Sequence, residues 1–264
     1  MFITAFLDAG FLVLCLMVVL WLISLAIKNS SIVDIFWGTG FVLIAWLTFL
    51  LFPEGYLPRK ILSVLLVTIW GLRLSIHIFL RNKGKGEDFR YQKWRNEAGP
   101  SWWYRSLFKV FLLQGFLMWI ISLPVVAAQV STSGPLNILD FFGVAVWIVG
   151  FYFEAAGDYQ LARFKSNPEN KGRVLNNGVW KYSRHPNYFG EALLWWGLFA
   201  AAAPAFRGWD FLTALGPLGL TLLLLFVSGV PLLEKAADKR FGADAAYLEY
   251  RRRTSVFVPL PRRK

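Results

Sequence analysis

Seven apolar runs dominate the chain, and short polar or turn-forming segments separate them. The runs lie near 6–27, 32–52, 61–80, 107–128, 137–156, 189–206 and 209–233. Each approaches the roughly 20 residues that an α-helix needs to cross about 30 Å of hydrocarbon. Proline and glycine mark the turns between several of them. The pattern predicts an all-α integral membrane protein with seven transmembrane helices.

The first run has the length of a retained span rather than of a cleaved signal peptide. As a helix, 6–27 would extend for about 33 Å. No basic residue precedes it, and no small-x-small cleavage site follows it. We therefore expect the run to remain in the protein as its first transmembrane helix.

The basic residues predict how the helices are oriented. The net charge is +12, and 23 of the 28 Lys and Arg residues fall in three segments, 81–109, 163–184 and 235–264. These segments alternate with loops that carry few cations, so the positive-inside rule puts the amino terminus outside and the carboxyl terminus in the cytosol. The orientation of the helices in the membrane therefore accounts for the net positive charge. Zinc-finger spacing and RNA-binding aromatic signatures are absent, so nucleic acid is not expected as a partner.

Several kinds of site are missing from the sequence. Cys15 is the single cysteine, so no thiol cluster can hold a metal, and we predict no metal site. Neither a dinucleotide-binding glycine motif after a strand nor a Walker loop occurs, and Gly38 and Gly40 lie inside an apolar run, where close helix packing is their expected role. Any nucleotide would therefore bind in a membrane-embedded pocket.

Ionisable residues at the ends of the apolar runs are the candidates for function, because charges inside a membrane are costly. Asp34, Glu154, Asp158, Glu191 and Glu234 all fall near the predicted cytosolic interface. Deeper in the third run, Arg73 and His77 share one helical face. We expect Asp34 to be the partner of Arg73, either as a structural ion pair or as part of a site.

The densest group of polar residues runs from Gly178 to Glu191, where a polar loop meets the sixth run. Pro186 suits the first turn of a helix, whose free amide groups attract phosphate, and Arg184 and His185 flank that position. Asn187, Glu191 and Trp195 follow at four-residue intervals and form one stripe. An interfacial anchor of Tyr182, Trp180 and Arg184 is the alternative, but it leaves the Asn and Glu unexplained, so the pattern favours a ligand site.

Two further segments carry groups that suit a nucleotide. Asp158 is followed by Arg163 and Lys165, and a carboxylate can accept from ribose hydroxyls while cations bind phosphates. The loop from Gly84 to Tyr91 contains Lys85 and can also bind phosphate. A basic belt at the membrane surface explains both segments equally well.

The segment 154–191, together with the tail to 259, resembles the steroid 5α-reductase family, in particular its bacterial DUF1295-like membrane branch. That resemblance implies seven transmembrane helices, NADPH as cofactor and reduction of an enone double bond. The family lines its cytosolic cofactor pocket with an Asp near the end of the fifth span and an Asn-x-x-x-Glu opening the sixth, which match Asp158, Asn187 and Glu191. Lys165 and Tyr188 fall where the family has a basic and an aromatic residue. The Gln-Glu pair and the Tyr that polarise the substrate carbonyl have no match, and Asp34 is the nearest acid.

The chain is also similar to isoprenylcysteine and phospholipid methyltransferases, which share this architecture and use S-adenosylmethionine. Arg-His-Pro-x-Tyr-x-Gly at 184–190 carries this second resemblance, together with Glu234, Phe241-Gly242 and Tyr247-x-x-Tyr250. A lipid or isoprenylcysteine methyltransferase is therefore the alternative function. A non-catalytic lipid-binding membrane protein is the third.

The leading prediction is an NADPH-dependent membrane reductase of a lipophilic, steroid-like or isoprenoid enone. We expect one membrane domain, 1–264, with substrate-side helices in 1–130 and a cofactor-binding half in 137–264. We also expect a monomer in a bacterial inner membrane that meets its substrate among the membrane lipids. The predicted catalytic residues are Glu191, Tyr188 and Asp34. The predicted cofactor-binding residues are Asp158, Arg163, Lys165, Tyr182, Arg184, His185, Asn187, Glu191, Lys85 and Glu234.

Overall fold

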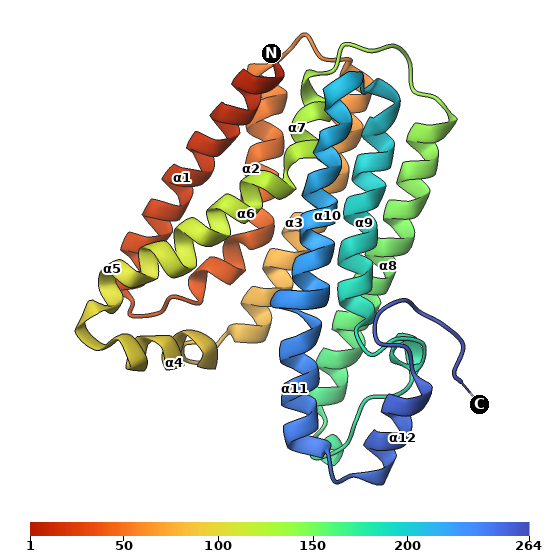
Figure 1. The fold of residues 1–264 in the computed structure, drawn as a ribbon. Helices are drawn as coiled ribbons and strands as arrows, with labels where there is room; N and C mark the ends of the chain where they lie inside the picture. The colour runs from red at the N-terminus through yellow and green to blue at the C-terminus, as the bar shows by residue number, and fades with distance from the viewer. Residues whose placement is uncertain (264) are drawn as a thin grey trace. The chain divides into compact units, whose positions relative to one another are not determined.

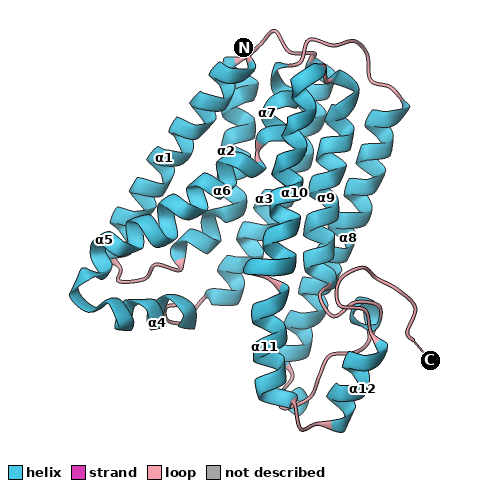
Figure 2. Cartoon of the chain, viewed as in Figure 1, coloured by secondary structure: helices cyan, strands magenta, loops and turns pink. Residues whose placement is uncertain are grey.

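The computed structural model describes residues 1–263, and within them the secondary structure is helical, with no strand (Figure 2). Six helical stretches in this part of the chain are long and apolar enough to cross a membrane. The all-α class is confirmed, and the six stretches indicate a multi-pass membrane protein. They are Phe2–Ala26, Ile32–Leu51, Leu57–Asn82, Phe89–Ile121, Ile138–Ser166 and Gly208–Phe241.

The predicted sixth run, 189–206, corresponds to a shorter helix than the others. Helix α9 covers Pro186–Ala202, and its 17 residues extend for about 25 Å at 1.5 Å per residue. A 3₁₀ turn, Ala203–Ala205, follows it directly. The count of seven spans and the orientation of the chain therefore stay predictions.

The chain divides into two compact units, which are described separately. The first unit comprises 1–138 and 202–216, and the second comprises 139–201 and the residues from 217 onward. The expected division of substrate and cofactor binding between 1–130 and 137–264 stays a prediction.

In the first unit, small residues bring α2 and α3 into close contact (Figure 1). A Cβ added at Gly38 would collide with the backbone of Gly71, and the Thr39 amide donates to Ser75 Oγ at 2.9 Å. The packing role predicted for Gly38 is confirmed. The unit's helices are α1 (Phe2–Ala26), α2 (Ile32–Leu51), α3 (Leu57–Asn82), α4 (Phe89–Ala98), α5 (Trp102–Ser106), a π-helical segment (Leu107–Leu112), α6 (Leu113–Ile121) and α7 (Leu123–Val130).

Two cations that fall between the second and third apolar runs are buried in the first turn of α3. Arg59 and Lys60 are each 2% exposed. The Lys60 ammonium donates to the carbonyl oxygens of Phe49 and Phe52 at the end of α2. A cation at the negative end of a helix is favourable and satisfies carbonyls that have no partner inside that helix.

In the second unit, glycines bring α8 and α9 together. Gly143, Gly150 and Gly157 recur every seven residues along α8, so they share one face. A Cβ at Gly150 would lie 2.5 Å from the Leu194 amide nitrogen, and one at Gly157 would lie 3.1 Å from that of Asn187. The first turn of α9 is thereby held against α8 beside Asp158. The unit's main helices are α8 (Ile138–Ser166), α9 (Pro186–Ala202), α10 (Leu215–Leu222), a π-helical segment (Leu223–Val227), α11 (Val230–Phe241) and α12 (Ala245–Arg253).

Helix α8 is longer than its apolar run. The run predicts an end near 156, but the helix continues to Ser166. Its last turns carry Leu161 and Phe164, which pack on a small cluster of Leu175, Val179 and Trp180. Asp158, Arg163 and Lys165 therefore lie on a helix and not beyond its end. The predicted boundary is wrong because hydropathy detects the part that faces lipid and not the helix as a whole.

Candidate functional site

The candidate site is built on the first turn of α9 in the second unit. The helix begins at Pro186, as predicted, and the Phe189 amide donates to the His185 carbonyl at 3.0 Å. The His185 amide donates to Ser183 Oγ at 3.1 Å. These bonds fix the backbone through which His185 and Asn187 present their side chains.

Asn187 joins α9 to α8 and leaves one polar atom without a partner. The side-chain nitrogen Nδ2 of Asn187 donates to Asp158 Oδ1 at 3.1 Å. This bond joins two of the residues that the sequence analysis predicted to bind the cofactor. Asn187 Oδ1 is buried and has no hydrogen-bond partner among residues 1–263. A buried acceptor without a donor costs about 1–3 kcal/mol. A ligand that donates a hydrogen bond would recover this cost.

His185 also has a buried polar atom without a hydrogen-bond partner. The side chain is buried, and Nε2 lies 2.8 Å from Glu234 Oε1. A carboxylate only accepts, so Nε2 carries the proton. Nδ1 is buried and has no hydrogen-bond partner within the described chain. The Tyr188 ring stacks near the imidazole, with centroids 6.0 Å apart.

The carboxylate that bonds His185 also belongs to a network of ion pairs. Arg184 pairs with Glu234 at 2.6 Å, and Arg251 pairs with Asp238 at 2.8 Å. In the neutral ring with Nε2 protonated, Nδ1 is an acceptor. Like Asn187 Oδ1, it suits a hydroxyl or an N–H and not a phosphate oxygen.

Arg184 and Glu234 form a brace for the carboxyl-terminal segment. The Arg184 guanidinium contacts both Glu234 oxygens, at 3.1 and 2.6 Å, and donates to the carbonyls of Arg251 and Thr254 at 2.7 and 3.0 Å. The Arg184 amide also donates to Ser255 O at 2.8 Å. The side chain is thus bonded within the chain itself, and its predicted role at a phosphate stays a prediction.

The tyrosines that resemble a methyltransferase motif have structural partners. Tyr247 donates to Asp238 at 2.7 Å, and Tyr250 donates to the Trp180 carbonyl at 2.8 Å. Burial, together with the hydrogen bond to Asp238, raises the pKa of Tyr247 to about 12. Burial also raises the pKa of Tyr250. Both therefore act as neutral donors that fix α12 to its neighbours.

Glu191 and Trp195 continue the stripe that Asn187 begins. Glu191 is half-buried, one turn along α9, and Trp195 is fully buried a turn further. The predicted stripe is therefore present on one face of the helix. The catalytic role expected for Glu191 and for the half-buried Tyr188 stays a prediction.

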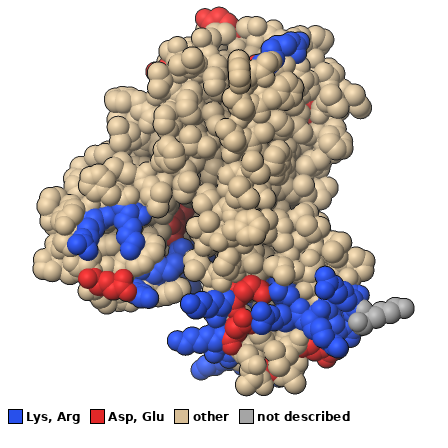
Figure 3. Space-filling model, viewed as in Figure 1, with Lys and Arg blue, Asp and Glu red and all other residues tan. Residues whose placement is uncertain are grey.

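The remaining cofactor candidates of the second unit are exposed. Arg163 and Lys165 project from the last turns of α8, and Tyr182 is 42% exposed. Figure 3 shows cations gathered around α11, α12 and the tail of this unit, while the α10 region is almost free of charge. These side chains are accessible to an anionic ligand, which is the property that phosphate binding requires.

A separate polar cluster lies in the first unit around Asp34. Its carboxylate accepts from Arg90 at 2.9 Å and from the Tyr91 hydroxyl at 2.6 Å. Gln114 donates to the Tyr91 oxygen at 3.0 Å. Asp34 is thus paired with Arg90, because α4 returns to the start of α2. The expected pairing of Asp34 with Arg73 stays a prediction.

Tyr91 and Gln114 were not predicted as site residues. Hydropathy does not detect α4 because the helix is polar, but its sequence signal was present: Asp88 caps it by accepting from the Arg90 amide at 3.0 Å. Gln114 follows the π-helical turn Leu107–Leu112, and such turns frequently occur at functional sites.

The loop from 84 to 88 ties α4 to the start of α2. Glu87 accepts from the Ser30 amide at 2.6 Å and from Arg95 at 2.8 Å. Burial acts to raise the pKa of Glu87, but the bonds from Arg95 and Ser30 outweigh it and hold the pKa below its ordinary value. Lys85 is exposed in this loop. Its predicted contact with a cofactor stays a prediction.

The fold and this site define a multi-pass helical membrane protein with two buried polar atoms that lack a hydrogen-bond partner among the described residues, both at the start of one helix. Comparison with family models gives the finer assignment. Residues 20–254 match the family described as "Protein of unknown function (DUF1295)". The chain belongs to that family, as its resemblance to the DUF1295-like branch predicted.

Two relatives illustrate the range of similarity. The chain is 26% identical over 274 residues to the uncharacterized protein C594.04c of Schizosaccharomyces pombe, covering 91% of this chain and 76% of the relative. It is 30% identical over 69 residues to 3-oxo-5-alpha-steroid 4-dehydrogenase 1 of Bos taurus, covering 26% of each. The match with the bovine protein thus spans about a quarter of its length. No solved structure matches the chain.

Proposed function

We propose that this protein is a membrane reductase that uses NADPH to reduce the C=C bond of a lipophilic enone. The observation that carries the proposal is the pairing of Asn187 with Asp158, which leaves Asn187 Oδ1 buried without a donor. Glu191 lies one turn further along the same face. This is the arrangement of Asp, Asn and Glu on which the family resemblance rests.

The residues present fit the cofactor in the polarity of their hydrogen bonds. Asn187 Oδ1 and His185 Nδ1 are acceptors without donors, and the carboxamide and ribose hydroxyls of a nicotinamide dinucleotide are donors. Arg163 and Lys165 are exposed cations for its phosphates. NADPH, when bound, supplies the hydride for one carbon of the double bond. The other carbon receives a proton.

The chain's own residues would bind the cofactor, orient it against the substrate and exclude water from the site. Asp158 orients Asn187, and Glu191 would hold the carboxamide end or the substrate carbonyl. Tyr188 is proposed as the neighbouring hydroxyl that moves a proton. The catalytic role predicted for Asp34 stays a prediction, because its carboxylate can only accept and both of its oxygens already accept, from Arg90 and Tyr91.

The similarity to 3-oxo-5-alpha-steroid 4-dehydrogenase 1 supports this class of reaction. The substrate is proposed to be a steroid-like or isoprenoid molecule that enters from the bilayer, and the protein is proposed to act as a monomer without nucleic acid. A bacterial inner membrane remains part of the proposal. The fission yeast relative places related chains outside bacteria as well.

A methyltransferase that uses S-adenosylmethionine is the alternative. Its strongest support is the pattern of Glu234, Tyr247 and Tyr250. Those side chains bond to Arg184, Asp238 and the Trp180 carbonyl, so packing of the tail accounts for them. A lipid-binding protein without catalysis is the third candidate, and it predicts no affinity for either cofactor.

Oxidation of NADPH by protein in nanodiscs tests the proposal, with a steroid 4-en-3-one and an isoprenoid enone offered as substrates. We expect Glu191→Gln to lower turnover by at least 100-fold, because one catalytic hydrogen bond is worth about 3 kcal/mol. Glu169→Gln, an exposed acid of the same unit, is the matched control and should leave turnover unchanged. Equal turnover in both variants would remove Glu191 from the mechanism.

A further inference from the structure

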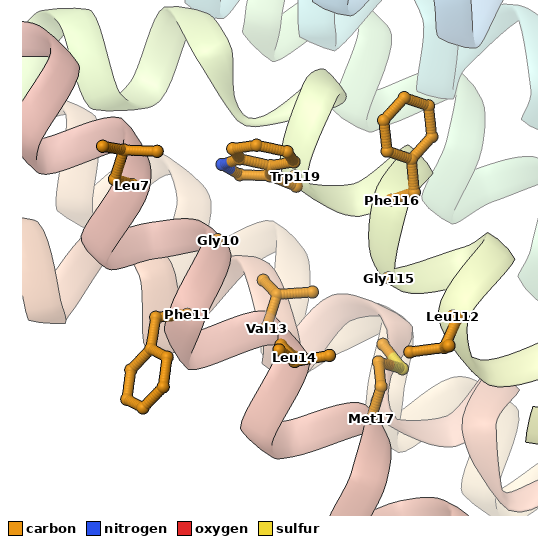
Figure 4. A pocket seen from close by; sticks show the side chains of 10 residues that line it. All are labelled: Leu7, Gly10, Phe11, Val13, Leu14, Met17, Leu112, Gly115, Phe116 and Trp119. Atoms are coloured by element: carbon orange, nitrogen blue, oxygen red, sulfur yellow. The ribbon is translucent and has the colours of Figure 1, made fainter.

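An apolar groove lies in the first unit between α1 and the segment of π-helix and α6 that packs on it (Figure 4). Its volume is about 340 Å³, and all the side chains that line it are apolar except for the ring nitrogen of Trp119. Val13 and Met17, at 3% and 0% exposure, belong to its buried side. The groove lies in the range of volumes that bind small molecules, roughly 300–1,000 Å³.

Packing of the indole of Trp119 on α1 keeps the groove in a fixed shape. Its Nε1 donates to the Phe6 carbonyl at 2.7 Å, and its ring stacks on Phe6 with centroids 4.3 Å apart. The indole lies over Gly10, where an added Cβ would come within 2.8 Å of the ring (Figure 4). The one polar atom of the wall is thus already bonded. An occupant of this groove needs no hydrogen-bonding group.

A second glycine admits a side chain of α1 to the wall formed by α6. A Cβ at Gly115 would lie 2.8 Å from Met17 Cγ. With Gly10 and Gly115 both free of side chains, α1 and α6 meet closely while the larger apolar side chains around them border a hollow. The two glycines therefore allow Trp119 to pack on α1 and Met17 to pack on α6 beside the groove.

The exposed side of the groove is apolar and belongs to candidate membrane-spanning segments, so we expect it to face hydrocarbon. Both walls belong to candidate membrane-spanning stretches. The residues at its rim include Leu7, Phe11 and Phe116, which are 57%, 70% and 55% exposed. From Leu7 to Met17 the groove follows α1 for about 15 Å. This is half of the roughly 30 Å of a bilayer's hydrocarbon, the depth of one leaflet.

We propose that this groove binds one acyl chain of a bilayer phospholipid as a resident lipid. The apolar lining, the opening toward the membrane and the length of one leaflet all suit a single hydrocarbon chain. This site is additional to the proposed reductase chemistry and does not depend on it, because none of the groove's residues takes part in the candidate sites of either unit.

Photolabelling of the protein in nanodiscs tests the proposal. The probe is a phosphatidylcholine with a diazirine in the middle of one acyl chain, and labelled peptides are counted by mass spectrometry. We expect label on α1 and α6 at the groove to exceed that on other lipid-exposed helix surface several-fold. Leu14→Trp, which fills the groove, should reduce this label at least threefold. Leu22→Trp is the matched control on α1, since Leu14 and Leu22 are 48% and 53% exposed and only Leu14 lines the groove.

The labelling results do not depend on whether the protein binds NADPH. Thermal unfolding of both variants checks that they fold. Label at the groove no higher than elsewhere, or an equal loss in Leu14→Trp and Leu22→Trp, would overturn the proposal. A parallel experiment uses an isoprenoid enone probe. Label from that probe alone would overturn it too, because the groove would then belong to the substrate.

Discussion

The polar cluster around Asp34 and the polar turn around Asn187 differ in how completely their hydrogen bonds are made. In the first unit, both Asp34 oxygens accept, from Arg90 and Tyr91, and the Tyr91 oxygen accepts from Gln114. In the second unit, Asn187 Oδ1 and His185 Nδ1 are buried without partners. The two clusters contain similar residue types, so residue type alone does not distinguish them.

This difference separates a structural role from a binding role. A completed network stabilises the fold and gains nothing from a ligand, whereas a buried acceptor without a donor costs free energy that a ligand recovers. We therefore expect changes in the Asp34 cluster to lower stability and changes at the start of α9 to lower cofactor affinity.

The largest expected effect in this comparison is on the stability of the first unit. Asp34→Ala removes the acceptor of both Arg90 and Tyr91, and Tyr91 is only 3% exposed. We expect the free energy of unfolding to fall by about 2–3 kcal/mol, because partners of a partly buried ion pair are left unsatisfied. Denaturation in detergent, followed by tryptophan fluorescence, measures it.

NADPH affinity of the same Asp34→Ala variant sharpens the comparison. It should stay within about twofold of the unmodified protein, since Asp34 bonds only within its cluster. Glu97→Gln on α4, whose side chain is 58% exposed, is the control and should change neither quantity. A tenfold loss of affinity with normal stability would show that the Asp34 cluster binds the cofactor.

A pair of substitutions at His185 distinguishes the role of Nε2 from the role of Nδ1. Glutamine reaches the Nε2 position and can keep the contact with Glu234, while asparagine keeps a polar atom near Nδ1. We expect His185→Gln to bind NADPH about tenfold more weakly with near-normal stability, because about 1.4 kcal/mol corresponds to tenfold.

His185→Asn should show the opposite behaviour. It loses the bond to Glu234 at 2.8 Å, so stability should fall by about 1 kcal/mol while affinity changes less than in His185→Gln. Calorimetry gives the affinities, and thermal unfolding gives the stabilities. The same response in both variants would contradict a specific role for Nδ1.

The smallest effect concerns acid stability at the loop between α3 and α4. The pKa of Glu87 is held below its ordinary value, which is about 4.3. Its contribution to stability is fully present above that ordinary value and is lost as pH falls through the lower folded pKa. Between pH 6 and pH 3.5 the unmodified protein should therefore lose more stability than Glu87→Gln. Parallel curves for the two proteins would contradict this.

The helices that face lipid were predictable from the hydropathy of the sequence. Hydropathy placed the helices of the apolar runs within a few residues at most ends. It missed α4 and α12, which are polar, and the last turns of α8, because those segments are stabilised by caps and local packing such as Phe164 on the Trp180 cluster. Neither π-helical segment leaves a hydropathy signal.

Part of the candidate site was predictable for a different reason. Asn187 and Asp158 lie together because glycines on α8 admit the first turn of α9, and the polar stripe could be deduced from helical spacing. The pairing of Arg184 with Glu234 joins residues 50 positions apart. Spacing along one helix cannot reveal such a contact, so Arg184 was predicted at a phosphate and Glu234 at the cofactor, while their bonds hold the carboxyl-terminal segment in place.

The most direct test of the central claim is calorimetric titration of the detergent-purified protein with NADPH and, separately, with S-adenosylmethionine. We predict micromolar NADPH binding that weakens at least tenfold in Asn187→Ala and is unchanged in Asn177→Ala, an exposed asparagine of the preceding loop. Binding of S-adenosylmethionine alone, or NADPH binding indifferent to Asn187, would contradict the account.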